Sequence, residues 1–194
     1  HIRAALRSGD LANDATTRLV WIGPLAPEGL DASNEIFYPC QSKDMAEIGQ
    51  PYVVLDTPGV TDTNHRAAEI AADALSLAPI KLLVIARDQV RAATNVQIAT
   101  RIDGALCIPV ISSVEPDELR DGTTLAIQLR SDLRTLRDQL HLRAPGVTLA
   151  PEVLVPDFEI TGNEEASAAS FVSQLLDRLS DLELSELSLA SARE

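Results

Sequence analysis

Short apolar runs alternate along this chain with segments of helical periodicity, and this alternation constrains the fold more than any other feature. The runs that resemble buried strands cover residues 52–56, 81–86, 106–111 and 152–156. The segments with helical periodicity cover residues 65–78, 91–103, 124–141 and 165–182. Strands that alternate with helices of this length form a mainly parallel sheet with helices on both faces. The sequence therefore predicts a three-layered α/β fold, as a single domain over residues 1–194.

Further elements are expected before the first buried run. Residues 2–8 are expected to form the end of a short helix, and residues 17–22 a strand at the edge of the sheet. A long connection over 23–50 follows, with one short helix near 42–48. Connections of this length are often functional. Pro109 makes the third apolar run the weakest strand prediction, because proline cannot donate to a ladder of hydrogen bonds.

The charge of the chain narrows the partners that it can bind. Its formal net charge is −13 at pH 7. An acidic surface repels phosphates, so direct nucleic-acid binding and electrostatic docking on an anionic membrane are not expected. No apolar run approaches the roughly 18 residues of a membrane-spanning helix. Cys40 and Cys107 lack the CxxC spacing of a metal site, and this pattern favours a reducing, cytoplasmic compartment.

The segment after the first buried run carries the most informative motif. Residues Asp56–Gly59 read Asp-Thr-Pro-Gly. Ligands of parallel sheets bind beyond the C-terminal ends of the strands. A carboxylate at such a strand end can hold Mg²⁺, usually through water. Gly59 has no side chain, so its backbone N–H can approach a phosphate. The alternative interpretation is a plain turn, because Pro-Gly is a common turn pair.

The motif and the elements before it resemble the switch regions of P-loop GTPases, in particular dynamin-like and Era-like members of the translation-factor-like class. In that family a helix follows the phosphate loop, and a switch I threonine, an antiparallel strand and the switch II strand come next. The matching features in this chain are residues 2–8, Thr17, 17–22 and 52–56, in that order. The resemblance implies a three-layer P-loop fold whose first strand is missing from this chain.

The resemblance also implies ligands and the residues that bind them. The implied ligands are GTP or GDP and Mg²⁺, with hydrolysis of the triphosphate. Thr17 and Asp56 are the implied Mg²⁺ ligands, and the nucleotide is implied to contact Thr17, Asp56, Gly59 and Glu115. Plain strand propensity is the alternative interpretation of Thr17. Val60 occupies the position of the glutamine that orients water in Ras-like members, so the catalytic residue is unassigned.

The base-reading motif of the family is altered in this chain. GTPases read guanine with Asn-Lys-x-Asp, and the matching residues Ser112–Glu115 read Ser-Ser-Val-Glu. Glu115 can still accept hydrogen bonds from guanine N1–H and its amino group. The alternative interpretation is that Glu115–Glu118 opens a helix, with acidic residues at its positive end. The last loop of the family is expected near Thr161–Gly162.

The phosphate-binding loop of the family does not occur in this sequence. No Gly-x-x-x-x-Gly-Lys-Ser/Thr is present, although such a loop surrounds the β-phosphate in P-loop proteins. Residues 1–6 resemble the piece that directly follows Gly-Lys-Ser in the family. We therefore expect the loop and the first strand to precede His1 in the native protein.

Several functions stay open on the sequence. The first hypothesis is a GTP-binding and GTP-hydrolysing switch, in which nucleotide state rearranges residues 10–50 and 56–66. The second is a degenerate G domain that acts as a scaffold for a protein partner or a homo-oligomer. The third is a ParA/MinD-like ATPase, which also carries Asp-x-Pro after a buried strand. A flavodoxin-like binding domain would not account for Asp56–Gly59.

Overall fold

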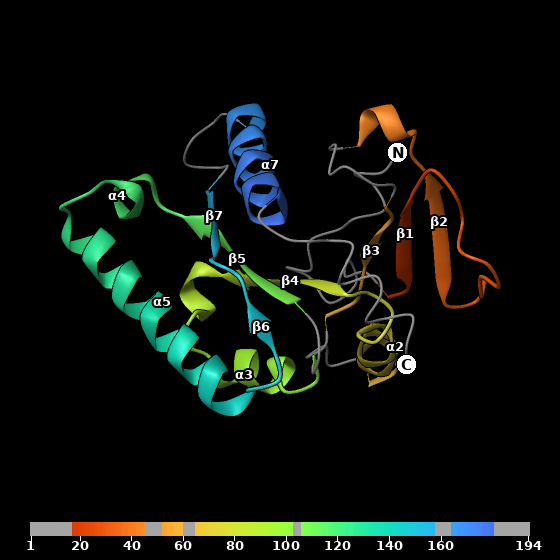
Figure 1. The fold of residues 1–194 in the computed structure, drawn as a ribbon, viewed down its shortest axis with the longest axis horizontal. Coiled ribbons are helices and arrows are strands. Elements are labelled where there is room, and N and C mark those ends of the chain that lie inside the picture. Colours follow the sequence, from red (N-terminus) through yellow and green to blue (C-terminus); the bar gives the residue numbers. More distant parts are fainter. Residues whose placement is uncertain (1–16, 46–51, 60–64, 103–105, 158–163, 181–194) are drawn as a thin grey trace. The chain divides into compact units, whose positions relative to one another are not determined.

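The computed structural model describes residues 17–45, 52–59, 65–102, 106–157 and 164–180. The residues group into two compact units, His1–Ala78 and Pro79–Glu194. Both units combine strands with helices, so the chain has an α/β fold (Figure 1). The predicted helix at 2–8 and the predicted loop at Thr161–Gly162 lie outside the described residues. The single G domain over residues 1–194 stays a prediction.

The first unit contains a mixed sheet in the order β2-β1-β3. Its strands are β1 (Leu19–Gly23), β2 (Glu35–Pro39) and β3 (Val54–Asp56), and its helical segments are η1 (Ser42–Asp44) and α2 (His65–Ala74). Strand β1 pairs in parallel with β2 and antiparallel with β3. The predicted edge position of the strand at 17–22 is therefore wrong. It is central because β2, inside the predicted long connection, pairs with its outer side.

The prediction of a buried strand at 52–56 is wrong in its burial and in its start. Val53 and Val54 are each 43% exposed, Leu55 and Asp56 are half-buried, and the strand begins at Val54. Within the described part of this unit, α2 is the α-helix available to cover the sheet. The apolar side chains of β1 and β2 are buried or half-buried apart from Pro39, whereas Val54 of β3 is exposed.

Gly23 lies at a close approach between β1 and the residue before β3. A Cβ added at Gly23 would lie 2.6 Å from Cγ1, 3.2 Å from Cβ and 3.3 Å from Cα of Val53. We expect Gly23→Ala to lower the free energy of unfolding by about 1–3 kcal/mol, because the side chain and backbone of Val53 must both shift. Urea denaturation measures this change. Val53→Ala in the same background removes the closest atom, so the double variant should regain part of the loss; an additive loss would contradict this explanation.

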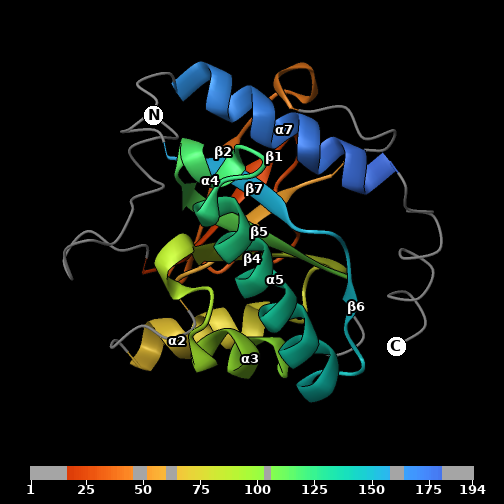
Figure 2. The same cartoon turned by 90° about the vertical axis from the view of Figure 1, so that its left-hand side faces the viewer.

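The second unit contains a parallel sheet in the order β4-β5-β6, and β7 also pairs with β5 (Figure 2). Its strands are β4 (Ile80–Ala86), β5 (Leu106–Val114), β6 (Thr148–Leu149) and β7 (Val153–Pro156). Its helices are η2 (Arg87–Gln89), α3 (Ala93–Ala99), α4 (Pro116–Leu119), α5 (Thr124–Arg143) and α7 (Glu164–Ser180). Helix α7 lies on one side of this sheet, and α3 and α5 lie on the other (Figures 1 and 2). The predicted three layers and parallel pairing are confirmed in this unit.

Pro109 lies in the central strand β5, which sequence reasoning had considered unfavourable. The N–H of Ala150 donates to the carbonyl of Cys107 at 3.0 Å, so residues 107 and 109 direct their backbone groups toward β6 and β7. Residues 150–152 separate β6 from β7 at this level. The missing N–H of Pro109 therefore faces a break in the neighbouring edge, where no ladder partner is needed.

The core of the second unit lies between β5 and α5. Side chains of β5 from Leu106 to Ile111 are buried, and α5 contributes Leu129, Leu133, Leu136 and Leu140. Leu125 lies four positions before Leu129, a spacing that predicts the same helix face, but it is 44% exposed in the first turn of α5. Cys107 is fully buried, and burial raises the pKa of its thiol to about 11. The thiol is therefore protonated and unreactive at neutral pH, as expected of a core cysteine.

Helix α7 protects the outer edge of β7 with a side-chain amide. Gln174 Nε2 donates to the carbonyl of Leu154 at 2.9 Å, and Gln174 Oε1 accepts from the N–H of Leu154 at 3.1 Å. The amide thus takes the place of a neighbouring strand at this residue. An edge satisfied in this way is a poorer template for pairing with another chain.

Candidate functional site

The register of the first unit brings its predicted site residues to one end of the sheet. Strand β1 runs antiparallel to β3, with Val20 opposite Asp56. Thr17 precedes Val20 by three positions and Gly59 follows Asp56 by three positions. Because the two strands run in opposite directions, both residues continue toward the same end of the sheet. Thr17, Asp56 and Gly59 therefore share the end at which β3 terminates.

Local sequence explains how this sheet end is shaped. Pro58 is fully buried and ends the strand, because its ring removes a backbone donor and fixes φ. Asp56 is half-buried, whereas Thr17 and Gly59 are exposed. The buried ring of Pro58 packs the turn against the sheet, between half-buried Asp56 and exposed Gly59. The backbone of Gly59 is therefore accessible.

The donors at this sheet end fit a magnesium ion better than they fit a transition metal. Asp56 offers a carboxylate and Thr17 a hydroxyl, and Mg²⁺ binds through one or two protein oxygens together with water and phosphate. Among the described residues there is no cluster of three or more His, Cys, Asp or Glu side chains of the kind that binds a metal by itself. An Mg²⁺ ion held by these two donors would take further oxygen ligands from water or phosphate.

The connection between β1 and β2 contacts the start of α2, which sequence reasoning missed. Arg66 Nη2 donates to Asn34 Oδ1 at 2.9 Å, and Asn34 Nδ2 donates to Asp31 Oδ2 at 2.7 Å. Asp31 Oδ1 also accepts from the hydroxyl of Ser33 at 2.6 Å and from its N–H at 2.9 Å. The hydrogen bonds from Ser33, followed by that from Asn34, lower the pKa of the Asp31 carboxyl. The signal that could have revealed this turn is Asp-x-Ser-Asn, since aspartate often caps its own turn.

In the second unit, the predicted base-reading segment lies at the end of β5 and is distorted. The pairing of β5 with β7 shifts register between Ile111 and Val114, which marks a β-bulge. Ser113 within the bulge has φ of 58°, in the left-handed region that serine rarely occupies. Glu115 follows as an exposed residue at the N-cap of α4. Bulges of this kind often redirect side chains beside functional sites.

The alternative interpretation of residues 115–118 is confirmed. Helix α4 begins at Pro116 and carries Asp117 and Glu118 in its first turn. The N–H of Glu115 donates to Glu118 Oε2 at 3.0 Å, and the N–H of Glu118 donates to the carbonyl of Glu115 at 3.0 Å. The side chain of Glu115 is exposed, and its role in binding a base stays a prediction.

A buried ion-pair cluster adjoins this segment, and sequence reasoning missed it. Arg87 directly follows β4 and pairs with Glu118 of α4 at 2.5 Å and with Asp132 of α5 at 3.0 Å. Asp132 also accepts from Arg91 at 2.6 Å and from Gln128 at 2.9 Å. We name these five residues the Arg87 cluster. The side chains of Glu118 and Asp132 are only 7% and 6% exposed, so the two carboxylates of the cluster are largely shielded from water, whereas Arg91 is exposed.

Asp132 is ionised within the cluster. Burial alone would raise the pKa of its carboxyl, but the hydrogen bonds from Gln128, Arg91 and Arg87 outweigh burial and lower it. The negative charge of Asp132 is therefore stabilised by the folded structure.

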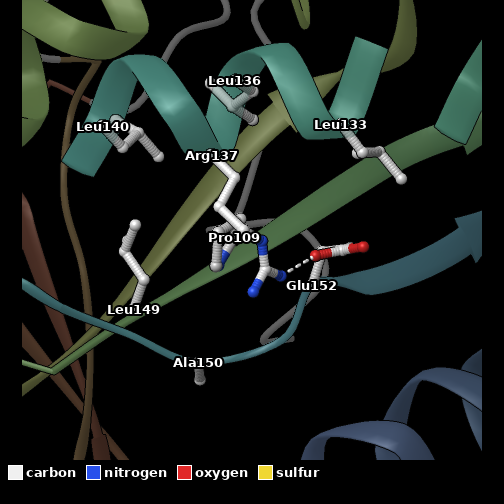
Figure 3. A pocket seen from close by; sticks show the side chains of 8 residues that line it. All are labelled: Pro109, Leu133, Leu136, Arg137, Leu140, Leu149, Ala150 and Glu152. Atoms are coloured by element: carbon white, nitrogen blue, oxygen red, sulfur yellow. Dashed lines mark hydrogen bonds and ion pairs between the residues drawn. The ribbon is translucent and has the colours of Figure 1, made fainter. Parts of the chain in front are cut away.

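A small cavity lies between α5 and the sheet of the second unit (Figure 3). Its volume is about 10 Å³, and its apolar lining comes from Pro109, Leu133, Leu136 and Leu140, among others. Arg137 reaches across its rim and forms an ion pair with Glu152 (Figure 3). A space of this size holds at most about one water molecule. It is a packing gap and is far too small for a nucleotide.

No family model, curated protein or solved structure matches this chain. Within the described ranges, no helix is both long enough and apolar enough to cross a membrane. A functional assignment therefore depends on the residues themselves: Thr17, Asp56 and Gly59 at one sheet end of the first unit, and Glu115 at a strand end of the second.

Proposed function

We propose that this chain is part of a GTP-binding switch domain that hydrolyses GTP with the help of Mg²⁺. The observation that carries the proposal is the antiparallel register of β1 against β3, with Val20 opposite Asp56. It groups a threonine, an aspartate and a glycine at one sheet end, in the order in which switch I and switch II of P-loop GTPases supply them. A plain turn at Asp56–Gly59 gives no reason for Thr17 to lie at the same end.

The parallel sheet of the second unit supports the same proposal. Strand β5 ends in the segment Ser112–Glu115, where GTPases read the base, and β4 ends at Ala86 beside Ser112. Ligands of parallel sheets bind at such carboxyl ends. The proposal also requires a phosphate-binding loop and a first strand that are not part of this sequence.

Each residue has a defined task under this proposal. Asp56 and Thr17 would hold the metal ion, whose charge neutralises the phosphates during hydrolysis. The backbone N–H of Gly59 would donate to the γ-phosphate, and the carboxylate of Glu115 would accept from the guanine edge. Loss of the γ-phosphate would remove the acceptor of Gly59, which is the change that a switch of this kind responds to. The Arg66–Asn34 hydrogen bond connects the start of α2 to the β1–β2 connection.

A nucleotide competition experiment tests the proposal. The protein that carries this chain, including whatever precedes His1 in its gene, is titrated with fluorescent GTP and Mg²⁺ and then with unlabelled competitors. Displacement by GTP and GDP but not by ATP supports a guanine switch. Displacement by ATP alone would favour the ParA/MinD-like ATPase.

A scaffold without nucleotide chemistry is the second candidate. The observation that favours it is the β-bulge at Ser112–Ser113, which stands where GTPases place an asparagine and a lysine. Neither serine can pack a long side chain over a base. Absence of binding by the well-folded full-length protein would support this candidate and reject the switch.

A further inference from the structure

We propose that Arg87 is a positioning residue that holds Glu115 in the orientation required to read guanine. This inference rests on the proposed function, because it assigns a determinant of base selectivity to the same site. Arg87 does not contact Glu115 directly. It acts through Glu118, which lies between them.

The first step of the connection is the carboxylate of Glu118, which binds both Arg87 and Glu115. Glu118 Oε1 accepts from Nε of Arg87 at 2.5 Å, and Glu118 Oε2 accepts from the N–H of Glu115 at 3.0 Å. The side chain of Glu118 is 7% exposed, so water cannot easily replace either partner. Loss of Arg87 would leave a buried carboxylate whose remaining partners cannot compensate its charge. Glu118 would then have to turn toward solvent and release the N–H of Glu115.

The second step is the anchoring of Arg87 itself. Its Nη1 lies 3.0 Å from Asp132 Oδ2, so one guanidinium joins α4 to α5 at the end of β4. Arginine can do this because its planar group presents donors in a fixed fork. Lysine has a single point of charge and cannot span both carboxylates with the same geometry. The position therefore requires arginine rather than any cation.

The third step is the backbone strain in Ser112–Glu115, the segment that Arg87 holds in place through Glu118. Ser113 occupies the left-handed region with φ of 58°, and such strained residues persist only where their surroundings fix them. The segment is held on one side by the N–H of Asp157, which donates to the carbonyl of Val114 at 2.9 Å. It is held on the other side by Glu118 through the N–H of Glu115. Releasing the second anchor allows the bulge to relax and the Glu115 carboxylate to move.

The expected consequence is a loss of selectivity that is separate from a loss of stability. Inosine triphosphate lacks the exocyclic amine of GTP, so the ratio of the two affinities reports the hydrogen bond to that amine. We expect the wild-type protein to prefer GTP by about tenfold or more, since the acceptor is charged. Arg87→Gln and Arg87→Lys should both bring this ratio close to one. General destabilisation would weaken both nucleotides equally and leave the ratio unchanged.

Arg130→Gln is the matched control. Arg130 lies on α5 and pairs with Asp121, but both side chains are largely exposed, at 60% and 94%, and this ion pair involves no residue of the Arg87 cluster. This variant should retain the wild-type ratio. A wild-type ratio in folded Arg87→Lys would overturn the inference, and Arg87→Lys also serves if Arg87→Gln does not fold.

Amide hydrogen exchange separates failure of this inference from failure of the proposed function. Exchange at the N–H of Glu115 should become at least about tenfold faster in the Arg87 variants and stay unchanged in Arg130→Gln. Unchanged exchange in the Arg87 variants overturns the positioning role whether or not a nucleotide binds. Faster exchange in a protein that binds no guanine nucleotide would reject the proposed function and the selectivity role, because the bridge would then serve the fold alone.

Discussion

Asp56→Ala should lower Mg²⁺-dependent GTP affinity by about a hundredfold in the protein that carries this chain. Under the proposed function, the carboxylate at the end of β3 holds Mg²⁺ at the sheet end that it shares with Thr17. A carboxylate that binds a metal ion through its water molecules accepts hydrogen bonds from a charged group, and such a bond contributes about 1.5–3 kcal/mol, or roughly 10- to 150-fold in affinity. Titration with fluorescent GTP, with Mg²⁺ and with a chelator, measures the change.

The Mg²⁺ dependence makes this prediction specific. The variant should bind GTP equally weakly with and without Mg²⁺, whereas the wild-type protein should bind tightly only with Mg²⁺. Asp73→Ala is a suitable control, because Asp73 is an exposed acid on α2 in the same unit. Equal Mg²⁺-dependent affinity in wild type and Asp56→Ala would remove the basis for the metal assignment.

Asp132→Asn should lower the free energy of unfolding by about 1–3 kcal/mol. The substitution keeps the shape of the side chain and removes one of the two carboxylates that neutralise Arg87, whose side chain is 18% exposed, while Glu118 remains as a partner of Arg87. The ion pairs of Asp132 with Arg87 and Arg91 are lost, and the contribution of exposed Arg91 is small because water screens it. Urea denaturation at neutral pH measures the effect. Asp138→Asn, an exposed acid on the same helix, should have little effect.

The same variant has a defined pH dependence. The folded state lowers the pKa of Asp132 below its ordinary value of 3.8. Its contribution to stability is therefore complete above that value and is lost as pH falls through the lowered folded-state pKa. The stability difference between wild type and Asp132→Asn should shrink when denaturation is repeated in steps below pH 4. A difference that persists or grows in acid would show that the charge of Asp132 does not stabilise the fold.

Elements with strong periodicity were predictable from the sequence. The strand predicted at 81–86 and the helices predicted at 124–141 and 165–182 appear as β4, α5 and α7 with nearly the same bounds. The apolar residues of the two helices recur at a single period over many positions, so local pattern and tertiary packing agree. Strand β4 forms where it was predicted, but the prediction that it is buried throughout is wrong, because Leu82 and Val84 are 41% and 65% exposed. The helix predicted at 91–103 is shorter, as α3, because Asn95 uses its side chain to bond the carbonyl of Gln89 instead of continuing a helix backward.

Strand β2 could not be predicted, for a physical reason. Its five residues, Glu35–Pro39, lie between proline- and glycine-containing stretches that indicate loops. A short strand is stabilised by its partner, and the partner β1 is separated from it by a long connection. The residues of β2 carry no local pattern that indicates its pairing with β1.

The sheet end of the first unit and the Arg87 cluster of the second unit also differ in how far the sequence could predict them. The grouping of Thr17, Asp56 and Gly59 follows from strand order and direction, which sequence patterns indicate. The Arg87 cluster joins residues from the end of β4, from α4 and from α5, which are distant along the chain. In a chain with many arginines and acids, each of these residues resembles a solvated surface charge. Only the packing of the helices reveals that they are buried together.

The most direct test of the central claim is where the metal binds. Mn²⁺ replaces Mg²⁺ in such sites and broadens the NMR signals of nearby amides. In the isotopically labelled protein that carries this chain, with GTP present, Mn²⁺ should broaden the amide signals of Thr17, Asp56 and Gly59, and should do so much less when GTP is omitted. Broadening elsewhere in the chain, or none in the presence of GTP, would contradict the assignment of this sheet end as the magnesium and nucleotide site.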